Sequence, residues 1–307
     1  VNATKAAANK ARRSNLKTVI KKAELAAANN AADKEEVILS PNTDHHGFYC
    51  PARNEADRVD MVFPVLHGRN GEDGTIQGLC QLNGIPCVSC DLTSSAISMD
   101  KEFTHIIAES YGIPMARYRV LKKNSHPDYE EVYKDVKSQL GLPCYVKPSK
   151  EGSSFGAHKV CNRDEFVKYC EDAFSYDEKI LIEEFIPGSE VGCGILGDCT
   201  SEMLYEVVVE TEMYGYTEKY DGYKTRIYVP AISLNEKQTE EIKRLSSIIA
   251  RALGVNVMAR ADFFAGDRLI FNEINLIPGF TSHSLYPAMF TASGKSYTEL
   301  AKAWYHF

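Results

Sequence analysis

A group of polar residues near the C-terminal end has the residue types and spacing of a metal and phosphate site. Arg260 and Asp262 alternate along one apolar segment, and Glu273 and Asn275 alternate along the next. A glycine–aspartate turn joins the segments, and a two-residue hairpin would pair Asp262 with Phe271 and place the four polar side chains on one face. Carboxylate and amide oxygens suit Mg²⁺ or Mn²⁺ holding nucleotide phosphates, and the arginine would stabilise a transferred phosphoryl group. The alternative is a solvated polar face, which the bulky residues between them disfavour.

A lysine and a glycine-rich loop follow one another in the middle of the chain. Lys147 stands near the end of the apolar segment 144–148, and Gly152-Ser-Ser-Phe-Gly156 comes directly after it. A lysine there would reach a nucleotide phosphate, and the backbone N–H groups and hydroxyls of the loop would surround phosphate oxygens. Taken alone, such a loop is more often a plain hairpin.

A third group lies in residues 180–190. Glu183 and Glu190 flank an apolar stretch that carries the aromatic Phe185. Backbone amide edges there would suit adenine, and a carboxylate would suit ribose hydroxyls. An edge strand that leaves a domain explains the same pattern, and this segment alone does not exclude it.

A fourth group, residues 66–75, places His67 and Glu72 in a glycine-rich turn after an apolar run. Open α/β sheets bind ligands at such turns. Helix capping by Asp73 or Thr75 explains part of the pattern only.

Around these groups, the apolar pattern predicts an α/β arrangement that becomes α+β after Pro143. Strands are expected at 59–66, 86–90, 144–148, 157–161, 179–186, 191–196, 203–210, 257–264 and 268–274. Helices are expected at 1–36, 75–82, 101–111, 128–140 and 236–253, the last capped by Gly254. Residues 37–57 combine Pro, Asn, Asp, His and Gly and are predicted to form a loop.

Composition limits the class of protein. The chain has 307 residues, of which 44% are hydrophobic and 25% charged, as is usual for a globular protein of two or three domains. A net charge of −7 argues against nucleic-acid binding by the whole molecule, although residues 1–30 carry seven basic residues against the single acid Glu24. No signal peptide and no apolar run of about 20 residues is present, which predicts a cytoplasmic protein without a membrane segment.

Three short motifs resemble other sites. Cys87 and Cys90 have zinc-knuckle spacing, but no second pair follows, so buried free thiols are expected. Gly192-Cys-Gly-Ile-Leu-Gly197 matches the dinucleotide-binding pattern, yet a turn and a valine-rich strand follow it where a helix is required. Residues 293–296 resemble the end of a P-loop, but the required earlier glycine is Met289, and a helix start is expected instead.

Taken together, the polar groups resemble the motifs of the D-alanine–D-alanine ligase family in order and spacing over about residues 55–300. The matching segments are 67–78, 98–101, 146–148, 152–156, 218–220, 260–262, 272–275 and 278–284. The segments 152–156 and 279–284 are most similar to the VanG-type branch of the family. The resemblance implies an ATP-grasp fold with an incomplete N-terminal α/β (preATP-grasp) domain after a basic helical segment. The implied boundaries are 1–36, 37–98, 99–184 and 185–307.

The resemblance implies ligation of two D-alanines to D-alanyl-D-alanine through an acyl phosphate, for peptidoglycan precursor synthesis. ATP and two Mg²⁺, for which Mn²⁺ substitutes, would bind between the central and C-terminal domains. Phosphates and nucleotide would be held by Lys101, Lys147, Ser153, Ser154, Glu183, Phe185, Ile186, Glu190, Lys219 and Asn272, and metals by Asp262, Glu273 and Asn275. Catalytic roles would fall to Arg260, Ser153, Tyr220 and Gly279, and substrate contacts to His67, Glu72, Ser284 and Leu285.

Two residues bear on the second substrate. Family members that make D-lactate esters lack the tyrosine found here as Tyr220, which makes an ester product unexpected. D-serine ligases tend to have arginine where this chain has Leu285, which favours D-alanine and leaves D-serine as the alternative.

The first 50 residues depart from the family pattern, because they contain no glycine-rich turn before a glutamate-bearing helix start. Residues 1–36 instead show a short similarity to bacterial ribosomal protein S20. The departure predicts that nucleotide binding persists while ligation is impaired, and a fusion or a misplaced gene start explains it equally. Alternatives are an ATP-grasp ligase for other substrates and a non-catalytic RNA-associated protein that uses the basic segment. The family also implies a homodimer, which the altered N-terminal domain would disturb.

Overall fold

The computed structural model describes residues 36–152, 155–209 and 225–304. The helix predicted for residues 1–36 therefore lies outside the described residues, except for Glu36. The chain divides into two compact units, Val1–Val62 with Leu79–Cys87, and Phe63–Gly78 with Val88–Phe307. The predicted domain boundaries after residues 98 and 184 divide the second unit more finely and stay predictions.

The described part of the first unit contains a three-stranded antiparallel sheet where a loop was predicted. Its strands are β1 (Ile38–Leu39), β2 (Gly47–Cys50) and β3 (Glu55–Arg58). The loop prediction was wrong because β3 is exposed along its whole length and has no apolar alternation to reveal it. Gly47 allows close pairing, since a Cβ there would lie 2.0 Å from the carbonyl oxygen of Asp57.

The strands predicted at 59–66 and 86–90 do not form. Val62 makes only an isolated parallel bridge with Cys87, and its N–H donates to the carbonyl oxygen of Pro86 at 2.9 Å. Both predicted strands contain a proline, Pro64 or Pro86, and a proline cannot donate a backbone hydrogen bond to a neighbouring strand. An apolar run therefore was not sufficient to make a strand here.

Three helices precede the central sheet: α2 (Thr75–Asn83), α3 (Leu92–Met99) and α4 (Lys101–Ser110). Asp100 ends α3 and begins α4, where its side chain accepts from the N–H of Glu102 at 3.2 Å. The carboxylate of Asp100 is also bound by Lys179 Nζ at 2.7 Å and by Ser149 Oγ at 2.8 Å. These contacts fix the first turn of α4 and hence the direction of the Lys101 side chain.

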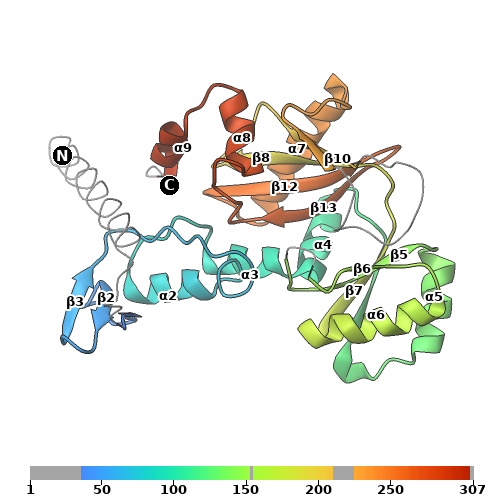
Figure 1. Cartoon of the computed structure of the whole chain (residues 1–307), viewed down its shortest axis with the longest axis horizontal. Helices are drawn as coiled ribbons and strands as arrows, with labels where there is room; N and C mark the ends of the chain where they lie inside the picture. Colours follow the sequence, from blue (N-terminus) through green and yellow to red (C-terminus); the bar gives the residue numbers. More distant parts are fainter. Residues whose placement is uncertain (1–35, 153–154, 210–224, 305–307) are drawn as a thin grey trace. The chain divides into compact units, whose positions relative to one another are not determined.

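The central sheet, so named for its place along the sequence, has four antiparallel strands in the order β4-β7-β5-β6 (Figure 1). Its elements are β4 (Tyr118–Lys122), a 3₁₀ turn η1 (Lys123–Ser125), α5 (Tyr129–Gln139), β5 (Cys144–Pro148), β6 (His158–Val160), α6 (Arg163–Tyr176) and β7 (Lys179–Glu184). Helix α6 covers the sheet through buried Phe166 and Phe174, which pack with Val146, Ile180 and Ile182. The helices and strands predicted over 128–184 are confirmed to within two residues.

The larger sheet has the order β11-β10-β8-β12-β13, with β9 paired to β8 (Figure 1). Its strands are β8 (Ser189–Leu196), β9 (Cys199–Thr200), β10 (Tyr205–Val209), β11 (Thr225–Tyr228), β12 (Met258–Ala265) and β13 (Leu269–Asn275). The remaining helices are α7 (Glu236–Ala252), α8 (Leu285–Ala292) and α9 (Tyr297–Ala303). A capping box at Asn235 begins α7, and left-handed Gly254 follows its end. The apolar face of α7, with Ile242, Leu245 and Ile249, packs on β8 and β12.

The motifs that resembled other sites are structural. The glycines of 192–197 lie in β8 and in the turn before β9, and Ser296 begins α9 with a capping box to Glu299. Cys90 is buried, Cys87 is half-buried, and both are free thiols. The strand and turn at 192–197 and the helix start at Ser296 are confirmed. The expected burial is confirmed for Cys90, whereas Cys87 is only partly buried.

The β12–β13 hairpin forms, but with a different register from the one predicted. Asp262 lies opposite Glu273, whereas Phe263 lies opposite Phe271, so Asn272 is an extra residue in β13. The connection has three residues, 266–268, and the predicted pairing of Asp262 with Phe271 is wrong. The prediction that Arg260, Asp262, Glu273 and Asn275 share one face is confirmed, since Arg260 lies opposite Asn275.

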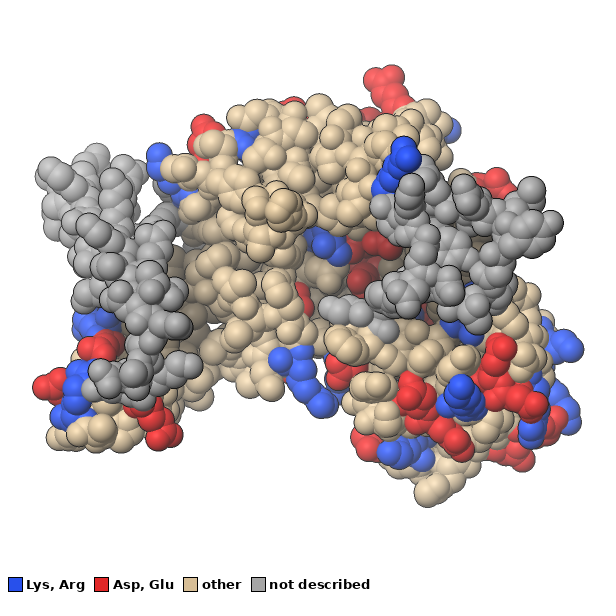
Figure 2. Space-filling model, viewed as in Figure 1, with Lys and Arg blue, Asp and Glu red and all other residues tan. Residues whose placement is uncertain are grey.

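Charged residues of both signs are interspersed over the described surface of the central sheet and its helices (Figure 2). Arg163, for example, pairs with Glu130 at 3.0 Å and with Asp164 at 3.1 Å. This face therefore offers no extended basic patch for a nucleic acid. None of the described helices combines the length and the apolarity needed to cross a membrane.

The opposite face of the β12–β13 hairpin is core, which generates a test of the fold. Phe263 is fully buried and meets Phe271 edge to face, with ring centroids 5.4 Å apart. Phe263→Ala is expected to lower the free energy of unfolding by about 3–5 kcal/mol. Tyr111→Ala, at a side chain that is 58% exposed, is the control and is expected to change it by less than about 0.5 kcal/mol. Chemical denaturation measures both, and equal effects would contradict the assignment of the core face.

Candidate active site

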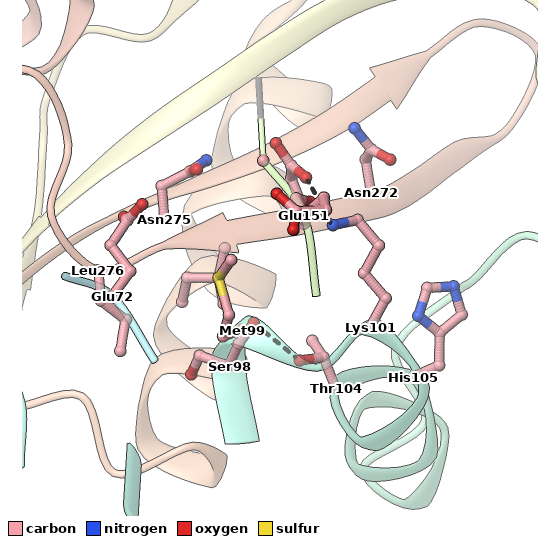
Figure 3. A pocket seen from close by; sticks show the side chains of 13 residues that line it. Glu72, Ser98, Met99, Lys101, Thr104, His105, Glu151, Asn272, Asn275 and Leu276 are labelled. Carbon is pink, nitrogen blue, oxygen red and sulfur yellow. Dashed lines mark hydrogen bonds and ion pairs between the residues drawn. The ribbon is translucent and has the colours of Figure 1, made fainter. Parts of the chain in front are cut away.

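A pocket of about 490 Å³, including the space at its open mouth, lies within the second unit. It is lined by Glu72, Ser98, Met99, Lys101, Thr104, His105, Glu151, Gly152 and residues 272–276. Five residues predicted for the site therefore line one pocket: Glu72, Lys101, Asn272, Glu273 and Asn275. Figure 3 shows Lys101 and His105 projecting from the same helix, α4, and Glu72 beside Asn275.

The two predicted phosphate lysines lie close to each other and are mostly buried. Lys101 donates to the backbone oxygen of Glu151 at 2.6 Å and lies 4.0 Å from the Glu273 carboxylate (Figure 3). Burial lowers the pKa of Lys101, and the positive charge of Lys147 lowers it further, against the opposing effect of Glu273. Two desolvated ammonium groups that repel each other would bind a phosphate chain more strongly than exposed lysines.

Glu183 is the carboxylate that pairs with Lys147 in the structure. Its Oε2 lies 2.5 Å from Lys147 Nζ, and its Oε1 lies 3.1 Å from His105 Nε2. Burial alone would raise the pKa of Glu183, but Lys147 and His105 outweigh burial and hold it at about 2. Glu183 therefore stays ionised and fixes the position of Lys147.

The Arg260–Asp262 pair is a second, largely buried ion pair of the site. Arg260 Nε and Nη2 donate to Asp262 at 2.8 and 2.7 Å, and the Asp262 side chain is only 1% exposed. Burial opposes the charge of Arg260, but Asp262 raises the arginine pKa well above its ordinary value. Asn275 Nδ2 and the hydroxyl of Tyr205 also donate to Asp262, at 2.9 and 2.8 Å. The carboxylate thus has its orientation set from several strands.

Several carboxylates gather around this pair. Burial raises the pKa of Glu190, and the negative charges of Asp262 and Glu273 raise it further. Burial also raises the pKa of Glu72, and the negative charge of Glu273 adds to this effect. The backbone hydrogen bonds to Glu72 lower its pKa but do not outweigh burial. Like charges in a poorly solvated site favour the entry of a cation.

The predicted metal ligands fit Mg²⁺ by their chemistry. Asp262 and Glu273 supply carboxylates and Asn275 an amide oxygen from one sheet face, which are the hard oxygens that Mg²⁺ prefers beside phosphates. Among the described residues no cluster of three His, Cys, Asp or Glu side chains is arranged around a metal position. That finding is compatible with a nucleotide-borne ion, since such ions use one or two carboxylates and take their other ligands from phosphate and water.

The segment that carries His67 and Glu72 is bound to the loop after β13. His67 Nδ1 lies 2.9 Å from the Ile277 oxygen, and Glu72 Oε1 accepts from the Ile277 N–H at 3.1 Å. Both backbone groups of Ile277 are therefore held by residues some 200 positions earlier in the chain. Glu72 Oε2 also accepts from the N–H of Gly68 at 2.7 Å, which closes the glycine-rich turn.

Gly279 and Ser284 lie in the loop that follows. A Cβ on Gly279 would be 2.8 Å from Ser284 Oγ, so the two residues lie close together and a side chain at 279 would require the serine hydroxyl to rotate away. Ser284 Oγ accepts from the Thr281 N–H at 2.9 Å, and Leu285 begins α8. The hydroxyl of Tyr297 donates to the Thr281 oxygen at 2.8 Å, which anchors this loop to α9.

The remaining predicted residues are distributed as follows. Phe185 is 38% exposed, with Lys159 Nζ 4.4 Å from its ring centroid. Ile186 is buried beside Ala116 and Ile270. Ser153, Ser154, Lys219 and Tyr220 lie outside the described residues, so their roles stay predictions.

Sequence reasoning missed three residues of the site. His105 stands four positions after Lys101 in α4, so helical spacing places both on one face and was sufficient to find it. Glu151 precedes the glycine-rich loop and contributes its backbone oxygen, which no side-chain pattern reveals. Tyr205 reaches Asp262 from β10 across β8, and strand order cannot be read from the chain.

Comparison with known proteins agrees with this geometry. The family model described as the D-ala D-ala ligase C-terminus matches residues 107–304, and the one described as the D-ala D-ala ligase N-terminus matches residues 5–90. The chain belongs to the D-alanine–D-alanine ligase family. It is accordingly an enzyme of the ligase class with the ATP-grasp fold. The sequence motifs indicated a family resemblance over residues 55–300. The N-terminal family model extends this resemblance toward the start of the chain and includes most of the basic segment 1–36.

Individual members of this family are similar over most of the chain. A D-alanine–D-alanine ligase of Acetivibrio thermocellus is 42% identical over 270 residues, which cover 86% of this chain and 72% of the relative. The vancomycin/teicoplanin A-type resistance protein VanA of Enterococcus faecium is 39% identical, with 86% and 77% covered.

Solved structures of the family give the same result. The VanG D-Ala:D-Ser ligase of Enterococcus faecalis has a TM-score of 0.80 and 37% identity, covering 89% of this chain and 79% of that one. The D-alanine–D-alanine ligase of Bacillus anthracis complexed with ATP has a TM-score of 0.68 and 29% identity, with 81% and 78% covered. The VanG structure agrees with the sequence likeness to that branch.

The Glu183 contacts predict a pH dependence of stability. The folded-state pKa of about 2 lies below the ordinary 4.5, so the stabilisation is complete above about pH 4.5 and is lost as the pH falls toward 2. Glu183→Gln is expected to remove on the order of 2–3 kcal/mol of this pH-dependent stability. Unfolding measured between pH 6 and 2.5 tests it. The control is Glu240→Gln, which breaks an exposed pair with Lys243. Parallel pH curves for the original chain and Glu183→Gln would contradict the assignment.

Proposed function

We propose that this chain joins two D-alanines with ATP, through an acyl phosphate, to give D-alanyl-D-alanine for peptidoglycan precursor synthesis. The observation that carries the proposal is one pocket in which Lys101, Glu273 and Asn275 meet beside the Arg260–Asp262 pair, in a chain of the ligase family. ATP is the proposed phosphoryl donor, and the cytoplasm is the proposed site of action because the reaction consumes ATP. A homodimer, which the family resemblance implies, stays a prediction.

Lys101 and Lys147 would hold the phosphates of ATP. Both ammonium groups are mostly buried, and both already face carboxylates, Glu273 and Glu183. When ATP enters, phosphate oxygens would compete for the lysines, and Glu183 would be released toward other donors. The adenosine would lie along Glu183–Glu190, where Phe185 offers an exposed ring and Glu190 a carboxylate for the ribose.

Asp262, Glu273 and Asn275 would hold Mg²⁺, and we propose that two such ions bind there. Bound there, the metal supplies charge neutralisation to the phosphates during transfer. Lys101, which begins α4 and lies 4.0 Å from Glu273, would bind the same phosphates.

The first chemical step would be attack by a carboxylate oxygen of the first D-alanine on the γ-phosphorus. A bond forms between that oxygen and phosphorus, the bond to the β-phosphate oxygen breaks, and ADP leaves with the electron pair. The segment with His67 and Glu72 would position this substrate, since Ile277 fixes it next to the loop with Gly279. Alignment of the reacting atoms is the main contribution in this type of transfer.

In the second step the neutral amine of the second D-alanine would attack the acyl carbon, and one proton of that amine would leave with the phosphate group, which departs as hydrogen phosphate. The tetrahedral intermediate carries an oxyanion, which Arg260 and the N–H of Gly279 would stabilise, and it collapses with loss of inorganic phosphate. Ser284 and Leu285 would receive the carboxylate end of the second substrate. Tyr220 and Lys219 would belong to a loop that closes near Ser153 and Ser154 and excludes water from the acyl phosphate.

D-alanine is the proposed second substrate, and D-serine is the alternative. Leu285 presents an apolar side chain, which offers no hydrogen bond to a serine hydroxyl. The similarity to a VanG D-Ala:D-Ser ligase supports the alternative, so the two substrates must be compared directly. Residues 1–50 contain no glutamate-bearing turn of the family type, and we propose a weakened affinity for the first D-alanine.

Coupled ADP release is the decisive assay. We expect D-alanine alone to give ATP-dependent ADP release and D-alanyl-D-alanine, with less mixed dipeptide when D-serine is added. Leu285→Arg is expected to increase the proportion of D-serine product. No ADP release with either amino acid would refute the proposed function. Robust turnover at an ordinary KM for D-alanine would refute the impairment alone.

Arg260 gives a test of the catalytic assignment. Arg260→Met removes the cation proposed to stabilise the oxyanion and is expected to lower kcat by about 10²–10³-fold. Arg251→Met is the control, because Arg251 is exposed on α7 and donates to the Ser247 oxygen. A tenfold or smaller loss of kcat in Arg260→Met would contradict the role given to this arginine.

A further inference from the structure

Tyr205 is a fully buried residue of β10 whose hydroxyl reaches two of the predicted site carboxylates. It lies 2.8 Å from Asp262 Oδ1 and 3.1 Å from Glu190 Oε1. Neither the sequence motifs nor the proposed mechanism uses this phenol. A buried hydroxyl between two carboxylates needs an explanation, because a buried polar group is retained at a cost unless it is well bonded.

The position of Tyr205 follows from the register of the sheet. Tyr205 lies opposite Gly192, Gly192 lies opposite Asp262, and Asp262 lies opposite Glu273. These four residues form one row across β10, β8, β12 and β13, and residues that lie directly opposite share a face (Figure 1). The phenol reaches Asp262 because the residue between them is glycine. A Cβ on Gly192 would lie 2.0 Å from the Tyr205 ring and 2.7 Å from Asp262 Oδ1.

The two oxygens of Asp262 have different neighbours. Oδ2 accepts from Asn275 Nδ2 at 2.9 Å and thus lies on the side of the β13 residues proposed as metal ligands. Oδ1 accepts from Tyr205 on the other side of the carboxylate. Arg260 donates to both oxygens, at 2.8 Å to Oδ1 and 2.7 Å to Oδ2. Tyr205 therefore bonds the oxygen that points away from Asn275. Oδ2 accepts from Arg260 and from the Asn275 amide, so a metal at Oδ2 would take the place of the Asn275 hydrogen bond.

We propose that Tyr205 is a positioning residue for the metal site: its hydroxyl fixes the plane of the Asp262 carboxylate and links it to the nucleotide carboxylate Glu190. The inference rests on the proposed function, in which Asp262 binds the metal and Glu190 the ribose. Hydrogen-bond partners behind a metal ligand fix its orientation, and their removal typically costs 10–100-fold in metal affinity. Tyr205 does not itself touch the metal or the reacting atoms.

The test compares Tyr205→Phe with Tyr286→Phe. Phenylalanine keeps the ring that packs over Gly192 and removes only the hydroxyl. Tyr286 is the matched control, because it is also fully buried and its hydroxyl donates to the Ile195 oxygen of the same sheet at 2.8 Å. Mn²⁺ affinity is measured by electron paramagnetic resonance with the non-hydrolysable analogue adenylyl imidodiphosphate, and circular dichroism melting verifies that both variants fold.

We expect Tyr205→Phe to bind Mn²⁺ at least about tenfold more weakly, while Tyr286→Phe binds it as the original chain does. The KM for D-alanine is expected to stay unchanged in Tyr205→Phe, because the substrate segment with His67 and Glu72 makes its contacts elsewhere. Equal Mn²⁺ affinity in Tyr205→Phe and the original chain would overturn this inference alone. An equal loss in Tyr286→Phe would overturn it too, because the loss would then reflect general loosening of the sheet. Failure of the original chain to bind Mn²⁺ with the nucleotide would overturn the inference and the proposed function together.

Discussion

The active site depends on the burial of several carboxylates close to one another on one face of the larger sheet. Glu190, Asp262 and Glu273 converge on one face, and Glu72 approaches from another segment. Burying such groups without partners costs several kcal/mol each, so the surrounding cations are a structural requirement as well as a catalytic resource. Arg260 satisfies Asp262 from the same strand, and Lys101 approaches Glu273 from α4.

The same balance of charges also fixes the lysines proposed to bind phosphate. Lys147 is held by Glu183, which is held in turn by His105 on α4. Asp100, at the start of that helix, is bound by Lys179 of β7 and by Ser149, which directly follows β5. The two lysines thus have fixed positions before any nucleotide binds, which reduces the ordering that binding requires.

The sequence predicted the parts of this arrangement that depend on local periodicity. Alternation with period two was sufficient to assign Arg260, Asp262, Glu273 and Asn275 to one face, because both strands keep that alternation near the site. The register was not predictable, since a bulge at Asn272 leaves no mark in an apolar pattern. Tyr205 was missed for a topological reason, namely that β10 and β12 become near neighbours only through β8. The first sheet was missed because Glu55–Arg58 pairs through its backbone alone and buries no side chain.

The pairing of Gly192 with Tyr205 makes these two positions interdependent. A residue larger than glycine at 192 fits the sheet only if the aromatic ring at 205 is absent. The Tyr205 hydroxyl in turn reaches Asp262 only while position 192 is glycine. A substitution at 192 is therefore expected to be most harmful while Tyr205 is present. Loss of the ring would relieve only part of the clash, because Asp262 Oδ1 also lies 2.7 Å from a Cβ at 192.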